Sequence, residues 1–167
     1  MFIDESGAKT NMTRLRGRAP RGARAHDSAP LCRWTVRTMI SSIRLDGSKA
    51  CMTIDAPTDG AVFQAFTEQV LVPALRPGDI VVMDNLGAHR REEIAAAVAR
   101  AGAQAEYLPA YSPDLNPIEK MWSKVKEFLR AAKARTSDAL DAAIAAAFQS
   151  VTAQDAAAWF AASGYTI

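Results

Sequence analysis

The sequence predicts an α/β domain in which a mixed sheet is flanked by helices. Three observations support this fold class. Residues 1–54 contain short β-type segments with a hairpin signal, residues 58–108 alternate between helical and strand patterns, and residues 117–162 are helical. Antiparallel strands followed by helix–strand units produce a mixed sheet with helices on its faces.

Residues 1–54 are predicted to supply three antiparallel strands. Residues 1–4 form a short first strand with Asp4 at its end, and residues 10–24 are irregular and rich in Gly, Pro and Arg. Residues 33–45 and 49–54 contain β-branched side chains and flank Asp46-Gly47, a strong turn signal. We therefore expect these two segments to form an antiparallel hairpin.

The middle of the chain changes period. Apolar side chains recur at helical spacing after Thr58, the expected N-cap, and Pro77-Gly78 ends that helix. The expected elements are a helix over 58–75, a strand over 79–83, a helix over 90–101 and a strand over 105–108. This alternation predicts two further strands, each joined through a helix.

The last third is predicted to be helical. A turn-rich stretch from Tyr111 to Pro117 opens an amphipathic helix over 117–132. One face of this helix is apolar and carries Ile118, Met121, Trp122, Val125 and Leu129. Two Ala-rich helices over 137–150 and 153–162 keep a helical apolar period and are expected to pack against the domain.

Composition excludes several classes of protein. The 167 residues suffice for one domain, and 49% hydrophobic with 23% charged residues is typical of a globular chain rather than a disordered one. No apolar run approaches the ~20 residues of a membrane span, and no signal peptide follows Met1. Two cysteines and two histidines are too few for a disulfide framework or a zinc site. We expect a soluble protein of a reducing compartment, without membrane contact.

Positive charge is concentrated in one segment. Residues 9–50 contain ten Lys or Arg and two acids, whereas the whole chain carries a net charge of only +2. Such a block is typical of a protein with a polyanionic partner, although a solvated Arg-rich loop has the same composition. We expect an exposed strip beside the functional site that contacts DNA phosphates, made of Arg14, Arg16, Arg18, Arg21 and Arg24.

Three acids lie where an open sheet places catalytic groups. Asp4 ends the first predicted strand, Asp84 ends the strand over 79–83, and Glu119 lies in the first turn of the amphipathic helix. Such carboxylates could hold two Mg²⁺ ions for phosphoryl chemistry. Each also has a structural alternative: Glu119 could complete a capping box, Asp84 could cap a turn, and Asp4 could be an ordinary strand-edge acid whose neighbour Glu5 competes for any role.

Taken together, these motifs resemble the mariner-like DDE transposases, specifically the bacterial insertion-sequence branch. The resemblance is carried by Phe-Ile-Asp-Glu-Ser-Gly at 2–7, by Val-Met-Asp-Asn-Leu-Gly-Ala-His at 82–89 and by Tyr-Ser-Pro-Asp-Leu-Asn-Pro-Ile-Glu at 111–119. The basic connection at 12–22 is also similar. Between Asp84 and Glu119 lie 34 residues, a spacing characteristic of this family.

The resemblance implies a ribonuclease-H-like fold and a Mg²⁺- or Mn²⁺-dependent reaction with two ions. Asp4, Asp84 and Glu119 fall on the catalytic, metal-binding triad. Asn85 and His89 fall beside the second acid, where a supporting or DNA-contacting role is expected; His89 could instead cap the following helix or lie exposed. The implied partners are transposon ends and target DNA, with a homodimer as the active complex in the bacterial cytoplasm at the nucleoid.

One family feature is missing from this sequence. The resemblance implies an N-terminal helix-turn-helix module, but the catalytic domain is expected to fill residues 1–167, with 136–167 as C-terminal helices. Two explanations stay open: the sequence is a fragment of a longer protein, or the gene is split and an N-terminal DNA-binding polypeptide is a partner. We therefore expect weak DNA binding without end specificity from this chain alone. Two other functions stay open: a nuclease on the same scaffold, or a catalytically silent regulatory protein that pairs with a transposase.

Overall fold

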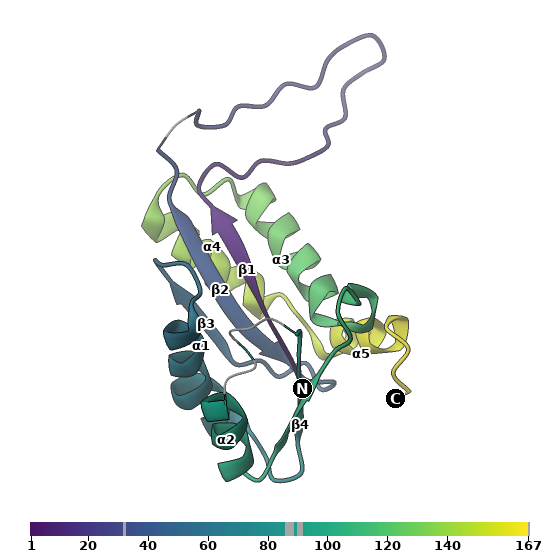
Figure 1. Cartoon of the computed structure of the whole chain (residues 1–167). Helices are drawn as coiled ribbons and strands as arrows, with labels where there is room; N and C mark the ends of the chain where they lie inside the picture. Colours follow the sequence, from purple (N-terminus) through teal and green to yellow (C-terminus); the bar gives the residue numbers. More distant parts are fainter. Residues whose placement is uncertain (32, 86–88, 90–91, 167) are drawn as a thin grey trace.

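The computed structural model describes residues 1–31, 33–85, 89 and 92–166. Five strands in this part of the chain form one mixed sheet (Figure 1). In chain order they are β1 (Phe2–Lys9), β2 (Val36–Ile43), β3 (Cys51–Ile54), β4 (Ile80–Met83) and β5 (Gln104–Tyr107). In space the order is β3-β2-β1-β4-β5; the first three strands are antiparallel neighbours, while β4 runs parallel to β1 and β5. The predicted mixed sheet is confirmed.

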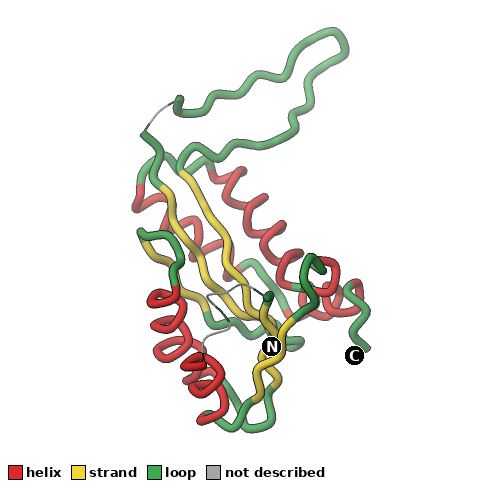
Figure 2. Tube along the Cα trace, in the orientation of Figure 1, coloured by secondary structure: helices red, strands yellow, loops and turns green. Residues whose placement is uncertain are grey.

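Helices cover both faces of this sheet (Figure 2). One face carries α1 (Gly60–Phe66), its π-helical continuation η1 (Thr67–Leu71), the short η2 (Val72–Ala74) and α2 (Glu92–Arg100). The other face carries α3 (Ile118–Ala132), α4 (Ser137–Gln149) and α5 (Ala153–Ala162), with η3 (Pro113–Leu115) leading into α3. None of the helices in the described ranges is long and apolar enough to cross a membrane.

Two apolar clusters fill the spaces between sheet and helices. Successive residues of a strand point to opposite faces, so Phe2 packs with α3–α5 while Ile3 packs with α1 and α2. Met39 and Ile40 of β2 divide in the same way. The sheet is therefore buried on both faces, which explains why its central strands contain so many apolar residues.

The hairpin between β2 and β3 forms as predicted around Asp46-Gly47. Gly47 has a φ of 79°, and a Cβ built there would lie 2.8 Å from the backbone of Ala153. The turn thus lies directly against the first residue of α5. Glycine is therefore required at position 47 for two reasons: the backbone is left-handed, and there is no space for a Cβ atom.

The structure corrects two of the predicted boundaries. β1 continues to Lys9 instead of ending at Asp4, because it pairs with β2 from Phe2 opposite Ile43 to Lys9 opposite Val36. The N-cap of α1 is Asp59 rather than Thr58: its Oδ1 accepts hydrogen bonds from the amides of Ala61 and Val62, both at 2.9 Å. Asp4 therefore lies within a strand, not at its end.

The connection between β1 and β2 projects beyond the ends of these strands, away from the rest of the fold (Figure 1). We call residues 11–34 the basic loop. Its base is closed by two hydrogen bonds, from the Thr10 amide to the Thr35 carbonyl at 3.1 Å and from the Thr35 amide to Thr10 Oγ1 at 3.0 Å. Arg135 supports this base by donating to the carbonyls of Thr10 and Met12 at 2.7 and 2.8 Å.

Candidate active site

The strand register places two of the predicted acids next to each other. Phe2 of β1 lies level with Val82 of β4 in the parallel pair. Asp4 follows Phe2 by two residues within β1, and Asp84 follows Val82 by two residues, directly after β4, so both acids lie at the same end of this strand pair. Because side chains alternate, Asp4 points to the face of α3–α5, as Phe2 does, and its neighbour Glu5 points to the face of α1. The register thus gives the adjacent acids Asp4 and Glu5 different surroundings.

α3 brings the third acid to the same place. Its apolar face is buried, with Met121 and Trp122 at 0% and 2% exposure, so the first turn is held against the sheet. Pro117 is the N-cap and makes no side-chain capping bond, and the Glu119 amide donates to the Asn116 carbonyl at 3.2 Å. The capping-box alternative for Glu119 is therefore absent from α3, and its side chain lines a pocket instead.

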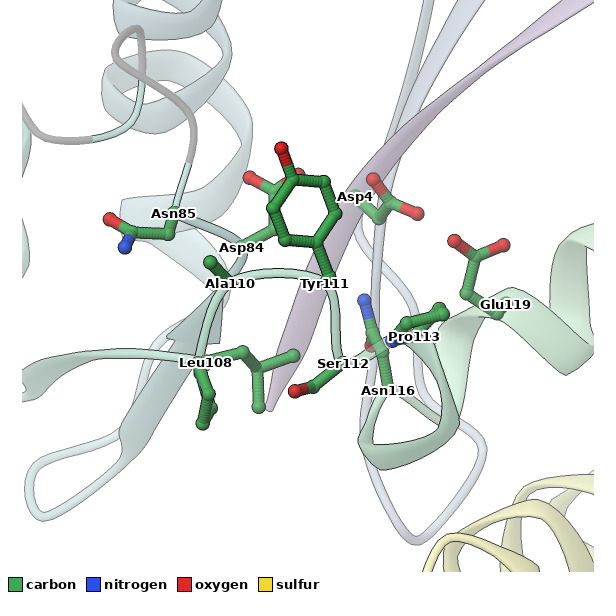
Figure 3. A pocket seen from close by; sticks show the side chains of 11 residues that line it. Asp4, Asp84, Asn85, Leu108, Ala110, Tyr111, Ser112, Pro113, Asn116 and Glu119 are labelled. Atoms are coloured by element: carbon green, nitrogen blue, oxygen red, sulfur yellow. The ribbon is translucent and has the colours of Figure 1, made fainter.

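Asp4, Asp84 and Glu119 line one pocket of about 390 Å³ (Figure 3). The segment from Leu108 to Pro113 also lines this pocket, and within it Tyr111 is fully exposed and has a φ of 59°. A left-handed backbone is costly for a bulky residue and is found most often at functional sites. The pocket is thus lined by three carboxylates and an exposed aromatic residue.

Asp4 is the most perturbed of these acids. Burial, and then the negative charges of Glu119, Glu5 and Asp84, raise the pKa of Asp4 from 3.8 to about 7, against the lowering effect of the Glu5 amide. That amide donates to Asp4 Oδ1 at 2.8 Å, and Trp122 Nε1 donates to Oδ2 at 3.1 Å. The carboxyl is thus held in a fixed orientation within a field of like charges, a setting that a cation would relieve.

Asp84 contacts a buried histidine. His89 Nδ1 lies 2.5 Å from Asp84 Oδ1, and His89 Nε2 lies 3.0 Å from Glu5 Oε1. Burial alone would lower the pKa of His89, but the contacts with Asp84 and Glu5 outweigh it and raise this pKa from 6.5 to about 10. The two carboxylates therefore favour the protonated form of this buried imidazole.

The donor set suits a hard divalent cation. Carboxylate oxygens are the ligands that Mg²⁺ and Mn²⁺ prefer, and Asn116 adds an oxygen at the pocket wall: its Oδ1 is buried and makes no hydrogen bond within the described residues. In the same described ranges, no three His, Cys, Asp or Glu side chains are close enough to hold one metal ion. Binding of one ion by all three carboxylates therefore requires these side chains to move closer together.

The predicted DNA contacts occupy three different environments. Asn85 is exposed at the pocket rim. His89 is fully buried, which favours the supporting role over DNA contact and over capping or exposure. The five arginines Arg14, Arg16, Arg18, Arg21 and Arg24 are exposed on the basic loop, and none of them lines the pocket. The strip is thus exposed as expected, but it is separate from the carboxylates.

Sequence reasoning missed three contributors to the site. The apolar period of α3 identifies Trp122 only as a packing residue, yet its indole donates to Asp4. Tyr111 is expected from the sequence only as part of a turn. Glu5 is expected as a rival to Asp4, whereas its carboxylate contacts His89. The alternation of side chains along β1 is the signal that could have separated Glu5 from Asp4.

Comparisons with solved structures find the same fold in transposases. The Mos1 transposase paired-end complex with left transposon end matches with a TM-score of 0.72 at 14% identity, covering 96% of this chain and 50% of that one. The Mos1 strand transfer complex matches at 0.69 and 16%, over 96% and 50%, and the Mos1 mariner paired end complex with Mn at 0.69 and 15%, over 96% and 51%. These likenesses confirm the predicted ribonuclease-H-like fold. The chain spans about half the length of each.

Sequence comparisons identify the family. No curated protein sequence matches this chain. The sequence profile described as DDE superfamily endonuclease matches residues 1–141, which include β1, the end of β4 and the first turn of α3. Its match thus contains all three carboxylates of the pocket. The chain belongs to the DDE superfamily endonuclease family.

Proposed function

We propose that this chain is the catalytic domain of a metal-dependent DNA transposase of the mariner-like type. It cleaves phosphodiesters at transposon ends and joins the freed 3′-hydroxyl groups to target DNA. One observation carries the proposal: Asp4, Asp84 and Glu119, which come from β1, the end of β4 and α3, line one pocket in a DDE-family fold. The transposon ends, strand transfer and Mn named for the Mos1 structures support the same function.

The residues of the pocket and of the basic loop would have different roles in this function. Asp4, Asp84 and Glu119 would hold Mg²⁺ or Mn²⁺, two ions in the complete site. Such ions supply an activated oxygen nucleophile and neutralise charge on the phosphate. Trp122 fixes the orientation of Asp4 through its 3.1 Å hydrogen bond, and Asn85 lies at the rim, where it can contact the DNA backbone. The exposed arginines of the basic loop would bind phosphates further from the reacting bond.

The partners and location belong to the same proposal. The active complex would be a homodimer that holds two transposon ends, with sequence-specific end recognition supplied by an N-terminal DNA-binding polypeptide. The protein would belong to the bacterial insertion-sequence branch and act in the cytoplasm at the nucleoid. Phosphate contacts alone do not distinguish sequences, so we expect this chain by itself to prefer cognate ends over random duplex by less than about tenfold.

A strand-transfer assay on pre-cut ends tests the proposal. The chain is incubated with labelled end oligonucleotides and supercoiled target in Mg²⁺, in Mn²⁺ and in EDTA. We expect joined products only with a divalent ion. Glu119→Gln keeps the size of the side chain but removes a metal-binding charge, so joining should fall by at least about 100-fold. Glu127→Gln, on the exposed side of the same helix, is the matched control and should retain activity.

The products separate the alternatives. Joined ends that disappear with Glu119→Gln support a transposase, whereas metal-dependent hydrolysis without joining indicates a nuclease. If the wild type binds DNA but neither cuts nor joins, the silent regulatory function replaces the proposal.

A further inference from the structure

The contact between Asp84 and His89 extends to a third residue. Glu5, His89 and Asp84 form a continuous chain, with 3.0 Å between Glu5 Oε1 and His89 Nε2 and 2.5 Å between His89 Nδ1 and Asp84 Oδ1. The exposed fractions of the side chains are 14%, 0% and 36% in that order. These three side chains thus connect the α1 face of the sheet, through a fully buried imidazole, to a residue that lines the pocket.

His89, the central residue of the three, has two further contacts. The His89 ring lies against Phe63 of α1, with the ring centroids 4.1 Å apart and an interplanar angle of 32°. The Tyr107 hydroxyl donates to the His89 carbonyl at 3.0 Å. His89 Nε2 is hydrogen-bonded to Glu5 Oε1 and the ring is fully buried against Phe63, so the position of the imidazole is fixed by Glu5 and α1 rather than by solvent.

We propose that Glu5 and His89 are positioning residues. Glu5 holds the His89 imidazole, and the imidazole in turn orients the Asp84 carboxylate for metal binding. The inference rests on the proposed function, because it assigns to Asp84 a metal that this function requires. Neither Glu5 nor His89 lines the pocket that contains the three carboxylates. Their effect on Asp84 passes through the contact between His89 Nδ1 and Asp84 Oδ1.

The location of Asp84 explains the need for such support. β4 ends at Met83, so Asp84 is the first residue after this strand. Asp4, in contrast, lies within β1 and receives hydrogen bonds on both oxygens from Glu5 N and Trp122. Partners behind metal ligands orient those ligands and commonly strengthen metal binding 10- to 100-fold, and His89 is placed to do this for Asp84.

Metal affinity is the direct test. Mn²⁺ binding to the full chain is measured by titration calorimetry for the wild type, Glu5→Ala and Glu5→Gln. We expect Glu5→Ala to weaken Mn²⁺ binding about 10- to 100-fold. Glu5→Gln keeps a hydrogen-bond partner for His89 Nε2 and should stay within about threefold of the wild type. Glu106→Ala, an exposed acid of β5, is the control and should change nothing.

A second variant and a stability measurement separate a loss of metal binding from a loss of folding. His89→Asn can place its amide where Nδ1 lies but cannot reach Glu5, so metal binding should fall as with Glu5→Ala and should no longer respond to changes at Glu5. Urea unfolding is followed for every variant. If Glu5→Ala lowers stability but leaves Mn²⁺ affinity within about twofold, the chain of contacts is merely structural and the proposal is overturned.

Failure of the proposed function can be told apart from failure of this inference. If the wild type binds no Mn²⁺, the metal-dependent function is refuted, and the ¹³C chemical shift of the Asp84 carboxyl then decides the inference. A shift that moves in Glu5→Ala but not in Glu106→Ala shows that Glu5 acts on Asp84 through His89. An unchanged shift overturns the proposed coupling.

Discussion

Replacing Asp4 by asparagine is expected to stabilise the metal-free protein at alkaline pH while it abolishes catalysis. The reason is the raised pKa of Asp4, about 7 against an ordinary 3.8. The folded state binds the proton more tightly than the unfolded state, so stability falls as the pH rises from 3.8 to about 7. Below this window the carboxyl is neutral in both states, and above it the whole penalty applies.

The magnitude follows from the same pKa. The penalty grows by about 1.4 kcal/mol per pH unit and levels off near 4 kcal/mol above the folded-state pKa, so it increases by about 2.5 kcal/mol between pH 5 and pH 8. Asparagine removes this penalty but offers one acceptor oxygen to two donors, the Glu5 amide and the Trp122 indole. The missing hydrogen bond costs about 1–2 kcal/mol at every pH. Asp4→Asn should thus be neutral at pH 5 and stabilising by about 2–3 kcal/mol at pH 8.

Urea unfolding in EDTA at pH 5, 6, 7 and 8 measures this difference. Asp138→Asn, on the exposed first turn of α4, serves as the matched control. Adding Mn²⁺ at pH 8 should stabilise the wild type and leave Asp4→Asn unchanged. If the effect of Asp4→Asn changes by less than about 1 kcal/mol between pH 5 and pH 8, Asp4 titrates normally and the crowding of carboxylates described above is wrong.

Four further outcomes are expected. Arg44 clamps Asp79 through two guanidinium nitrogens and lowers the pKa of Asp79 to about 2, so Asp79→Asn should cost about 1–2 kcal/mol in urea unfolding at pH 7. This cost should shrink as the pH falls from 4 towards 2, and a constant cost would contradict the assignment. Gly47→Ala should destabilise by at least about 1 kcal/mol, because φ is 79° and the new Cβ meets Ala153; an unchanged thermal midpoint would refute this. Tyr111→Ala should weaken DNA binding about 5- to 100-fold in fluorescence anisotropy while Tyr111→Phe does not, if the exposed ring stacks on a base. Replacing the five arginines of the basic loop by glutamine should flatten the salt dependence of DNA binding by about 0.9 for each phosphate that is no longer neutralised, and an unchanged slope would exclude phosphate binding by the loop.

The elements that sequence predicts well are those whose signals are local. The β2–β3 hairpin follows from Asp46-Gly47 between two β-type segments, and α3 follows from its apolar period. Glu119 could be placed because it lies in the first turn of α3. Its direction, however, depends on how α3 packs against the sheet, which no spacing within the helix determines.

The errors occur where tertiary pairing decides. The sequence predicts a first strand that ends at Asp4, and Ser6 and Gly7 are weak strand formers, but the ladder with β2 extends the strand to Lys9. The segment over 58–75 is predicted as one helix. Instead it passes through a π-helical turn before Pro73, which has no amide hydrogen to continue an α-helix.

The environment of the site was beyond sequence reasoning for a related reason. Glu5 and His89 are 84 residues apart, and the contact between them depends on the β1–β4 register and on the packing of α1. The carboxylates themselves could be predicted because each lies near the end or the beginning of an element with a clear local signal. Their pKa values and partners could not, because burial and neighbouring charge exist only in the folded chain.

The closed base of the basic loop has a consequence for how this fold can diversify. Thr10 and Thr35 are hydrogen-bonded to each other, and Arg135 fixes the first residues of the loop, so its ends are held together whatever lies between them. Once the ends are fixed, doubling the length of a flexible connection costs only about 0.6 kcal/mol. Insertions, deletions or exchanged segments between these anchors would therefore leave the sheet and its carboxylates intact. The basic loop can therefore be exchanged as a unit, and related proteins can acquire new contacts there while the catalytic domain keeps its fold.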